Sequence, residues 1–286
     1  MLPAMPKKPQ IAIVGPGRLG SALSIELNTA GYRISELVVR RHSRQAAALA
    51  RRLRARILRL NSGGIQADVV WFCVPDREIT GAAQVLASHS VWNGKIVFHS
   101  SGALPSSELD DLRRRGATVA AVHPLMTFVR GSTPSLSGVP FALEGDEPAL
   151  RAARRIVRDL GGDAFNIRAQ DKVAYHTWGA FTSPLFIALL VAAEQVARAA
   201  GLSTPAARRK MLPILHQTIQ NYGRLGPAGA FSGPLVRGDT EVVRKHLKVL
   251  RRIPGAKDIY TALARIAISR LPVQRRAELG EALCER

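Results

Sequence analysis

The sequence has few cysteines and no grouping of residues suited to bind a metal ion. Its two cysteines, Cys73 and Cys284, lie far apart and show neither zinc-site nor redox-motif spacing. It also lacks a Gly-x-Ser-x-Gly segment, which excludes the usual nucleophile turn of the α/β-hydrolases. We therefore expect no metal site, and a reducing, cytoplasmic setting.

Acidic residues are scarce. The chain of 286 residues has 21 Asp and Glu against 41 Lys and Arg, a net charge of +20. Such an excess attracts polyanions without specificity. The basic clusters, however, are spread over several expected helices and lack interleaved aromatic side chains. We interpret them as solvated faces that steer small anions, and we expect no specific nucleic-acid partner.

A secretion signal and a membrane anchor are not expected either. Only residues 1–10 precede the first apolar run, which leaves no room for a signal peptide. The segment Val173–Ala193 carries no Asp, Glu, Lys or Arg and is nearly long enough to span a bilayer. It contains His176 and Pro184, and it does not have an aromatic belt at each end. We therefore expect a buried helix at a domain or subunit core, and no membrane association.

A glycine motif near the start carries the clearest functional signal. It follows the apolar run Ile11–Val14 and opens a stretch with helical spacing. Strand, tight turn and helix are the context of the dinucleotide fingerprint G-x-G-x-x-G, in which a diphosphate lies on the helix N-terminus. The expected cofactor-binding residues of this loop are Gly15, Pro16, Gly17, Arg18, Leu19 and Gly20.

The end of the second expected strand, 34–39, indicates which dinucleotide binds. An NAD-binding chain usually has Asp or Glu here, to hold the ribose hydroxyls. This chain has Arg40, Arg41 and Ser43 instead. Guanidinium and hydroxyl groups favour a 2′-phosphate, which a carboxylate would repel. We therefore predict NADP (NADPH) as cofactor; the alternative is that these residues belong to a generally arginine-rich surface.

The pattern of elements predicts two domains. Apolar runs alternate with helical patterns in the first part, which favours a parallel, doubly wound sheet. The expected strands are 10–14, 34–39, 56–58, 69–74, 95–99 and 118–122, with two shorter ones near 139–143 and 163–167. Later patterns are helical: 171–200, 205–223, 239–251, 256–270 and 274–284. We expect an α/β fold with an N-terminal Rossmann domain (1–168) and an all-α C-terminal domain (169–286).

Polar residues follow three of the later strands, where ligands of parallel sheets bind. Val74 and Pro75 end one strand and Ser100 follows the next, so we expect them at the cofactor. Ser101 is a candidate donor to a substrate oxygen; its alternative is to cap the next helix. His123 is a candidate for binding an anion or transferring a proton, and its alternative is a structural role.

The helical part adds three candidates. Lys172 and His176 are spaced i, i+4, so both can face one cleft, where either is a possible proton donor. The alternative is that both have structural roles, with the Lys172 side chain in solvent and the His176 ring packed against neighbouring residues. Arg237, in a glycine-rich segment, is suited to grip a carboxylate bidentately.

Together these segments resemble a known family. The resemblance rests on Gly15–Gly20, Val74-Pro75-Asp76, His99–Leu104, His123-Pro124-Leu125 with Thr127-Phe128, Tyr175-His176 and Ser232-Gly233-Pro234 with Arg237-Gly238-Asp239. The chain is similar to bacterial proteins in which a DUF2520 domain follows a Rossmann-like domain. They are similar in plan to pyrroline-5-carboxylate, ketopantoate and 6-phosphogluconate-type reductases. The resemblance implies a helical domain that closes the cofactor cleft and a homodimer formed through long helices. This chain departs from many members at Pro184, where they have Asn.

We expect an NADP-dependent reductase that acts on a C=O or C=N next to a carboxylate. The substrate would be a small anion, either a 2-oxo acid such as ketopantoate or a cyclic imine. Ser101, His123 and Arg237 would orient it, and His176 or Lys172 would supply the proton. An alternative is a non-catalytic NADP sensor. Nucleic-acid binding through charge alone would instead be steeply salt-dependent and insensitive to NADPH.

Overall fold

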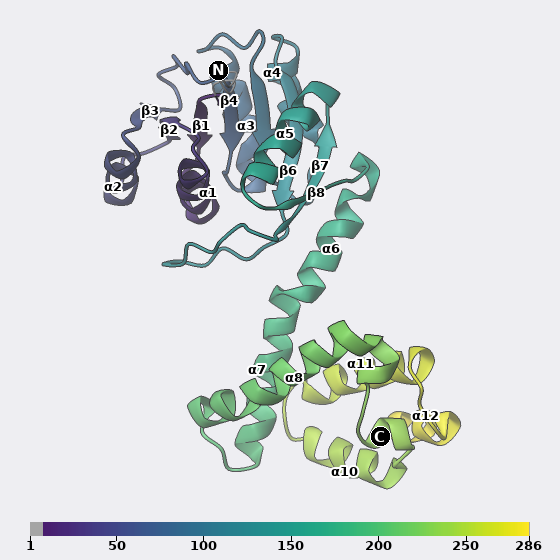
Figure 1. The fold of residues 1–286 in the computed structure, drawn as a ribbon. Coiled ribbons are helices and arrows are strands. Elements are labelled where there is room, and N and C mark those ends of the chain that lie inside the picture. The colour runs from purple at the N-terminus through teal and green to yellow at the C-terminus, as the bar shows by residue number, and fades with distance from the viewer. Residues whose placement is uncertain (1–7, 286) are drawn as a thin grey trace, which may run out of the picture. The chain divides into compact units, whose positions relative to one another are not determined.

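The computed structural model describes residues 8–285 and divides into two compact units, Met1–Ala180 and Phe181–Arg286. We call them the Rossmann unit and the helical unit (Figure 1). The division falls inside helix α6 (Lys172–Thr182). Most of the N-terminal segment that we considered for a signal peptide lies outside the described residues.

The Rossmann unit is built on one sheet of eight strands in the order β3-β2-β1-β4-β5-β6-β7-β8. The strands are β1 (Ile11–Val14), β2 (Ile34–Val39), β3 (Arg56–Arg59), β4 (Val69–Phe72), β5 (Ile96–His99), β6 (Thr118–Pro124), β7 (Pro140–Gly145) and β8 (Asp163–Asn166). The chain reverses its direction of strand addition between β1 and β4, which is the switch point where ligands bind in this architecture.

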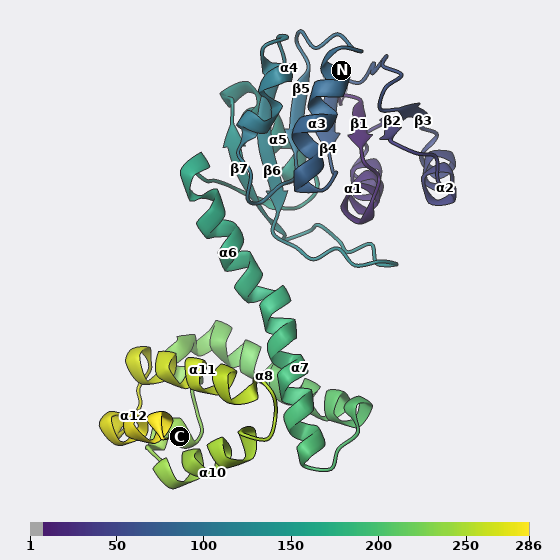
Figure 2. The same ribbon diagram turned by 180° about the vertical axis from the view of Figure 1, so that it is seen from behind.

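Helices cover both faces of the sheet, which confirms the predicted doubly wound α/β fold (Figures 1 and 2). Two apolar clusters share strand β1: Ile11 and Ile13 belong to one, and Ala12 and Val14 to the other. This alternation follows from the two-residue period of a strand. The first cluster is completed by α1 (Arg18–Thr29), α2 (Arg44–Leu53) and α5 (Glu147–Asp159), and the second by α3 (Asp76–Ala87), η1 (Ser106–Leu109) and α4 (Asp110–Arg113).

The last two strands, β7 and β8, run against the other six. β7 pairs antiparallel with β6, while the remaining neighbours are parallel. The connection between β6 and β7 has no helix, so it cannot make the crossover that a parallel pair requires. The expectation of a parallel sheet therefore holds for most of it, and the two late strands extend the same sheet as predicted.

The helical unit contains no strand among its described residues. The short η2 (Ala169–Asp171) and most of α6 belong to the Rossmann unit, and the helices that follow are α7 (Pro184–Ala199), α8 (Thr204–Ala230), α9 (Pro234–Arg237), α10 (Thr240–Leu250), α11 (Ala256–Arg270) and α12 (Arg276–Cys284). The expected single helix over 171–200 is interrupted at Ser183, just before Pro184. The expected helix over 205–223 matches the first part of α8, which is broken at Gly226, where φ is +69°; a second helical stretch then continues to Ala230.

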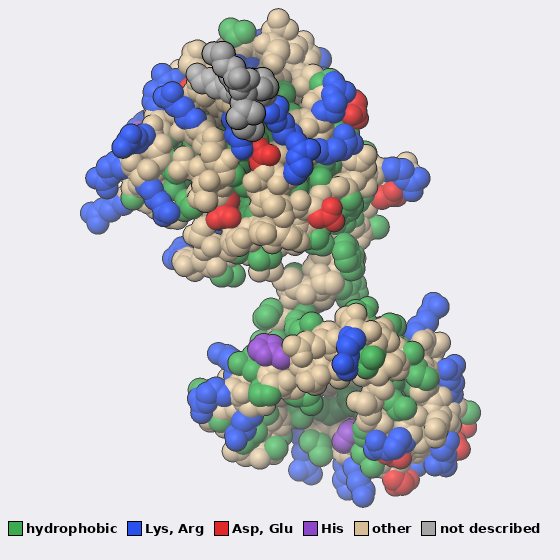
Figure 3. Space-filling model, in the orientation of Figure 1, with side chains coloured by type: hydrophobic (Ala, Val, Ile, Leu, Met, Phe, Trp, Pro, Cys, Tyr) green, Lys and Arg blue, Asp and Glu red, His purple; other side chains and the backbone are tan. Residues whose placement is uncertain are grey.

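The apolar segment of α6 and α7 is mostly exposed in the single chain. Trp178, Phe181 and Ile187 each expose more than half of their surface, and Figure 3 shows hydrophobic side chains across the helical unit's surface. The helix over 169–199 is long and apolar enough to cross a membrane by length and composition. Our expectation of a buried helix is therefore not met within one chain, because the described residues leave these side chains uncovered.

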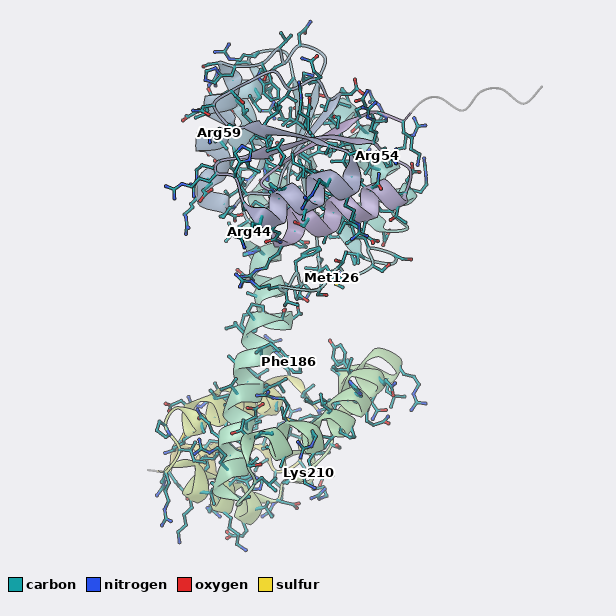
Figure 4. All side chains as sticks on the ribbon, turned by 90° about the vertical axis from the view of Figure 1, so that its left-hand side faces the viewer. Arg44, Arg54, Arg59, Met126, Phe186 and Lys210 are labelled. Atoms are coloured by element: carbon teal, nitrogen blue, oxygen red, sulfur yellow. The ribbon has the colours of Figure 1, made fainter. Side chains whose placement is uncertain are left out.

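Basic side chains cover the outside of the Rossmann unit. Arg44, Arg54 and Arg59 are exposed, and their side chains project from the unit in Figure 4. Within the described part of the chain, none of the three forms an ion pair with a carboxylate, while Arg56, between the last two, is paired with the buried Glu36 at 2.8 Å. The excess positive charge is therefore carried largely on solvated faces.

Candidate functional site

The glycine loop between β1 and α1 has a conformation that side chains would prevent. Gly15 has φ +85°, and a Cβ on it would lie 2.6 Å from Cγ1 of Val74. A Cβ on Gly20 would lie 2.4 Å from the carbonyl oxygen of Gly15, so this helix residue packs directly on the turn. Gly17, in contrast, faces open space. The loop thus leaves backbone accessible at the start of α1, where N–H groups attract anions.

A pocket of about 540 Å³ lies beside this loop. Its lining includes Arg40, Arg41 and Ser43 from the end of β2. The Ser43 hydroxyl accepts a hydrogen bond from the Ala46 N–H and so caps α2. A second helix N-terminus therefore adds to the two guanidinium groups, and together they favour a phosphate at this end of the pocket.

Most of the predicted cofactor-binding residues line this pocket, and some do not. Gly15, Pro16, Gly17, Val74 and Pro75 contribute to its wall.

The other predicted cofactor residues lie elsewhere in the unit. Arg18 lines a neighbouring groove that shares Gly17 with the pocket. Leu19 packs against the apolar core. Ser100 accepts a hydrogen bond from the indole of Trp71 at 2.8 Å, beyond the pocket wall.

The wall also contains Cys73, whose thiol pKa burial raises to about 12. At neutral pH that thiol is protonated, so it adds no charge to the pocket and is a poor nucleophile.

A second group of polar residues gathers at the ends of β5 and β6. A Cβ on Gly102 would lie 2.9 Å from Nε2 of His123 and 2.9 Å from Cδ2 of His176, so the bare backbone of Gly102 separates these two rings. The ring centroids are 6.4 Å apart. Two predicted site residues distant in sequence are therefore brought together against one backbone segment.

His123 is held by a tyrosine. Its Nδ1 lies 2.8 Å from the hydroxyl of Tyr175, and the two rings pack edge to face. Burial, together with the nearby positive charge of Lys172, lowers the pKa of His123 to about 4. Burial also raises the pKa of Tyr175 to about 12. At neutral pH both groups are uncharged, which suits hydrogen bonding rather than ion pairing.

Ser101 is already engaged within the protein. Its hydroxyl donates to Asp76 at 2.8 Å and accepts from the N–H groups of Ala103 and Leu104. Its backbone N–H donates to Nδ1 of His99. These bonds fix the turn that carries Gly102. The Ser101 hydroxyl therefore acts more like the cap of the alternative interpretation than like a donor that is free to bind a substrate.

Lys172 is fully buried, and its amine donates to the carbonyl oxygen of Ser101 at 3.2 Å. Burial lowers its pKa, while the carboxylates of Glu144 and Asp76 act in the opposite direction. His176, one helical turn later, is exposed. The expected shared cleft for Lys172 and His176 is therefore not seen: one side chain points into the protein and the other outward.

Arg237 belongs to the helical unit, at the end of α9. Its guanidinium is mostly exposed and pairs with Asp239 at 2.7 Å. A substrate carboxylate at this position would share the guanidinium with Asp239 or replace it.

The sequence did not assign a role to three residues that the structure places at these sites. They are Asp76, which holds Ser101; Tyr175, which holds His123; and Glu78, which lines the pocket. Tyr175 and Asp76 occur in segments that carry the family resemblance. No sequence pattern marked Glu78, because only the folded structure shows that helix α3 lies at the pocket. Among residues 8–285, no group of three or more His, Cys, Asp or Glu is arranged to hold a metal ion.

The fold and the glycine loop define a Rossmann-type protein with an appended helical unit. Models of two families match the chain: a Rossmann-like domain over residues 4–124 and a domain of unknown function, DUF2520, over residues 139–267. The chain belongs to the proteins that combine a Rossmann-like domain with a DUF2520 domain, as the sequence predicted.

Solved structures with the same fold are similar at low identity. A Bacteroides fragilis protein provisionally named an NADP oxidoreductase is 20% identical, with a TM-score of 0.76 over 91% of this chain and 97% of that one. A Thermotoga maritima protein is 23% identical, with a TM-score of 0.71 over 96% and 98%. A reductive aminase from Aspergillus terreus, in complex with NADPH and ethyl-5-oxohexanoate, is 15% identical, with a TM-score of 0.64 over 96% and 99%. No curated protein matches the chain significantly.

Proposed function

We propose that this protein is an NADP(H)-dependent reductase. The observation that carries the proposal is the pocket beside the glycine loop, with Arg40, Arg41 and Ser43 where NAD-binding chains have an acidic residue. The same fold in proteins named for NADP-dependent chemistry supports this assignment. The reaction would be transfer of a hydride to a C=O or C=N group.

The residues present fit such a cofactor. The space above Gly17 suits a diphosphate, and the second N-terminus, at α2, suits the 2′-phosphate beside Arg41 and Ser43. When bound, NADPH supplies the hydride, and the protein supplies position and charge. A side chain on Gly15 would collide with Val74, so the turn that forms this cradle requires glycine.

We further propose that the substrate is a small anion with a carboxylate next to the reducible group. The Gly102 N–H and the neutral His123 ring would orient its oxygen or nitrogen, and the exposed His176 beside them would donate the proton. Lys172 and Ser101 would act as positioning residues, because their bonds hold the Gly102 turn. A 2-oxo acid such as ketopantoate and a cyclic imine are the two substrate types, and Arg237 is the candidate carboxylate ligand.

We also propose a cytoplasmic homodimer whose interface includes the helices from Trp178 to Ala193. The exposed Phe181 and Ile187 on this segment support it, since apolar surface of this extent is unfavourable in water. Light scattering at micromolar concentration should give twice the chain mass of 30.9 kDa. A monomer mass would contradict this proposal.

Cofactor titration tests the central assignment. NADPH should bind at least about tenfold more tightly than NADH, followed by nicotinamide fluorescence. Arg41→Ala should weaken NADPH binding by about 1–3 kcal/mol, the scale of a hydrogen bond to a charged group, with little change for NADH. Arg51→Ala is the matched control, because Arg51 lies on α2 outside the pocket.

Equal affinities for the two cofactors would contradict the NADP assignment. A panel of 2-oxo acids and cyclic imines then separates catalysis from sensing: oxidation of NADPH with either substrate type supports the reductase. Tight NADPH binding without turnover on any member of the panel would favour a sensor instead.

A further inference from the structure

The cofactor pocket contains a carboxylate that comes from an unexpected element. Glu78, in the first turn of α3, is the one Asp or Glu among the described residues that line the pocket. Its Oε1 lies 3.4 Å from Nη1 of Arg40, the first arginine after β2. An acidic residue is thus present at the adenosine end of the pocket, although the strand that usually supplies it has none.

This ion pair stands where a 2′-phosphate would bind. A guanidinium engages a carboxylate or a phosphate with the same donors, so a phosphate at Arg40 must share or displace Glu78. Two anions held near one another also repel. A ribose 2′-hydroxyl carries no such conflict, because it can donate a hydrogen bond to a carboxylate. Glu78 therefore acts in opposite directions on the two nicotinamide cofactors.

We infer that Glu78 is a specificity-determining residue that limits the preference for NADPH by competing with its 2′-phosphate for Arg40. The inference rests on the proposed function, since it concerns the same cofactor pocket. Glu78 also lies in the first turn of a helix, where a negative charge stabilises the helix dipole. That structural role would affect folding stability but not the ratio of the two cofactor affinities, so the ratio is the quantity to measure.

Glu78→Gln removes the charge and keeps the size of the side chain. We expect the variant to bind NADPH about threefold to tenfold more tightly than the original chain, the scale of one partly solvated charge pair. NADH binding should be unchanged or weaker. Glu108→Gln is the matched control: Glu108 is also partly buried and contacts α3 through Thr80, but it does not line the pocket. It should leave both affinities unchanged.

The same substitution in an Arg40→Ala variant tests whether Glu78 acts through Arg40. In Arg40→Ala the competition for the guanidinium is gone and only the direct effects of the Glu78 carboxylate on the two cofactors remain, so adding Glu78→Gln should change the NADPH-to-NADH affinity ratio by a smaller factor than in the original chain. A full threefold to tenfold change in that background would overturn the competition. An unchanged ratio in Glu78→Gln alone, or weaker NADPH binding, would overturn the inference as well.

Failure of this inference is distinguishable from failure of the proposed function. If the original chain binds NADPH tightly and Glu78→Gln leaves the ratio unchanged, only the role of Glu78 is wrong. If the original chain binds neither cofactor, the reductase proposal itself fails. Thermal unfolding of each variant, measured in the same buffer, shows whether the Rossmann unit is intact in every comparison.

Discussion

Acid should destabilise the Rossmann unit, because its interior holds two histidines in the uncharged state. Nδ1 of His99 accepts a hydrogen bond from the Ser101 N–H, so this nitrogen carries no proton. Its Nε2 lies 2.9 Å from the carbonyl oxygen of Pro105 and must be the protonated one. Burial lowers the pKa of His99 to about 4, as it does for His123.

The size of the effect follows from these pKa values. An unfolded histidine has a pKa near 6.5, so between about pH 6.5 and pH 4 the unfolded chain binds a proton that the folded chain does not. Stability is therefore unaffected at pH 7 and falls with decreasing pH, by about 1.4 kcal/mol per pH unit for each histidine. At pH 5 the loss is about 2 kcal/mol each, and below pH 4 it is complete at about 3 kcal/mol each.

Urea unfolding at pH 7 and pH 5 measures this loss, followed by the fluorescence of Trp71 and Trp92, which are buried in the unit. The two histidines together should lower the unfolding free energy by about 4 kcal/mol. His123→Gln should remove about half of the pH dependence, whereas His42→Gln, at an exposed position, should remove none. Equal stability at the two pH values, or a folded His99 that titrates near 6.5 in NMR spectra, would refute the reasoning.

Three further predictions concern the residues proposed to bind or protonate the substrate. Gly102→Ala places a methyl group within 2.9 Å of both histidine rings, so substrate turnover should fall at least about tenfold while NADPH titrations stay unchanged. Arg237→Ala should raise KM more than it lowers kcat in steady-state kinetics, because a carboxylate grip acts alike on ground and transition states. His176→Ala should lower kcat by about a hundredfold if this side chain donates the proton. Full kcat in both His176→Ala and Lys172→Ala would show that the site is misplaced.

The fold was predictable because its signals are local. Each strand of the sheet is a short apolar run that ends in a turn, and the glycine loop identifies which run comes first. The direction of β7 was not predictable in this way. It depends on the connection over residues 125–139, which has no helical or strand periodicity to show how the chain returns. The helical stretch after Gly226 was missed for a similar reason, since it lies in a Gly- and Pro-rich segment without helical periodicity.

The site was predictable only in part. The glycine loop and Arg41 are adjacent in sequence to the strands that place them. The i, i+4 spacing of Lys172 and His176 describes one helix and says nothing about what each side chain meets. The amine of Lys172 lies near Ser101, Asp76 and Glu144, which are contributed by other elements. Burial of a side chain by elements that are distant in sequence cannot be predicted from spacing. Glu78 was missed for the same reason, because it meets Arg40 from a different element.

The order of the units along the chain affects how the protein is made. All eight strands precede residue 167, so the ribosome has synthesised the complete sheet before it reaches the apolar helices α6 and α7. The first unit can therefore fold during translation, while the exposed apolar helices appear late. This order shortens the time for which a nascent chain exposes the apolar surface of α6 and α7. At high expression levels, newly released chains should depend on chaperones or on rapid association, because aggregation increases with concentration whereas folding of the first unit does not.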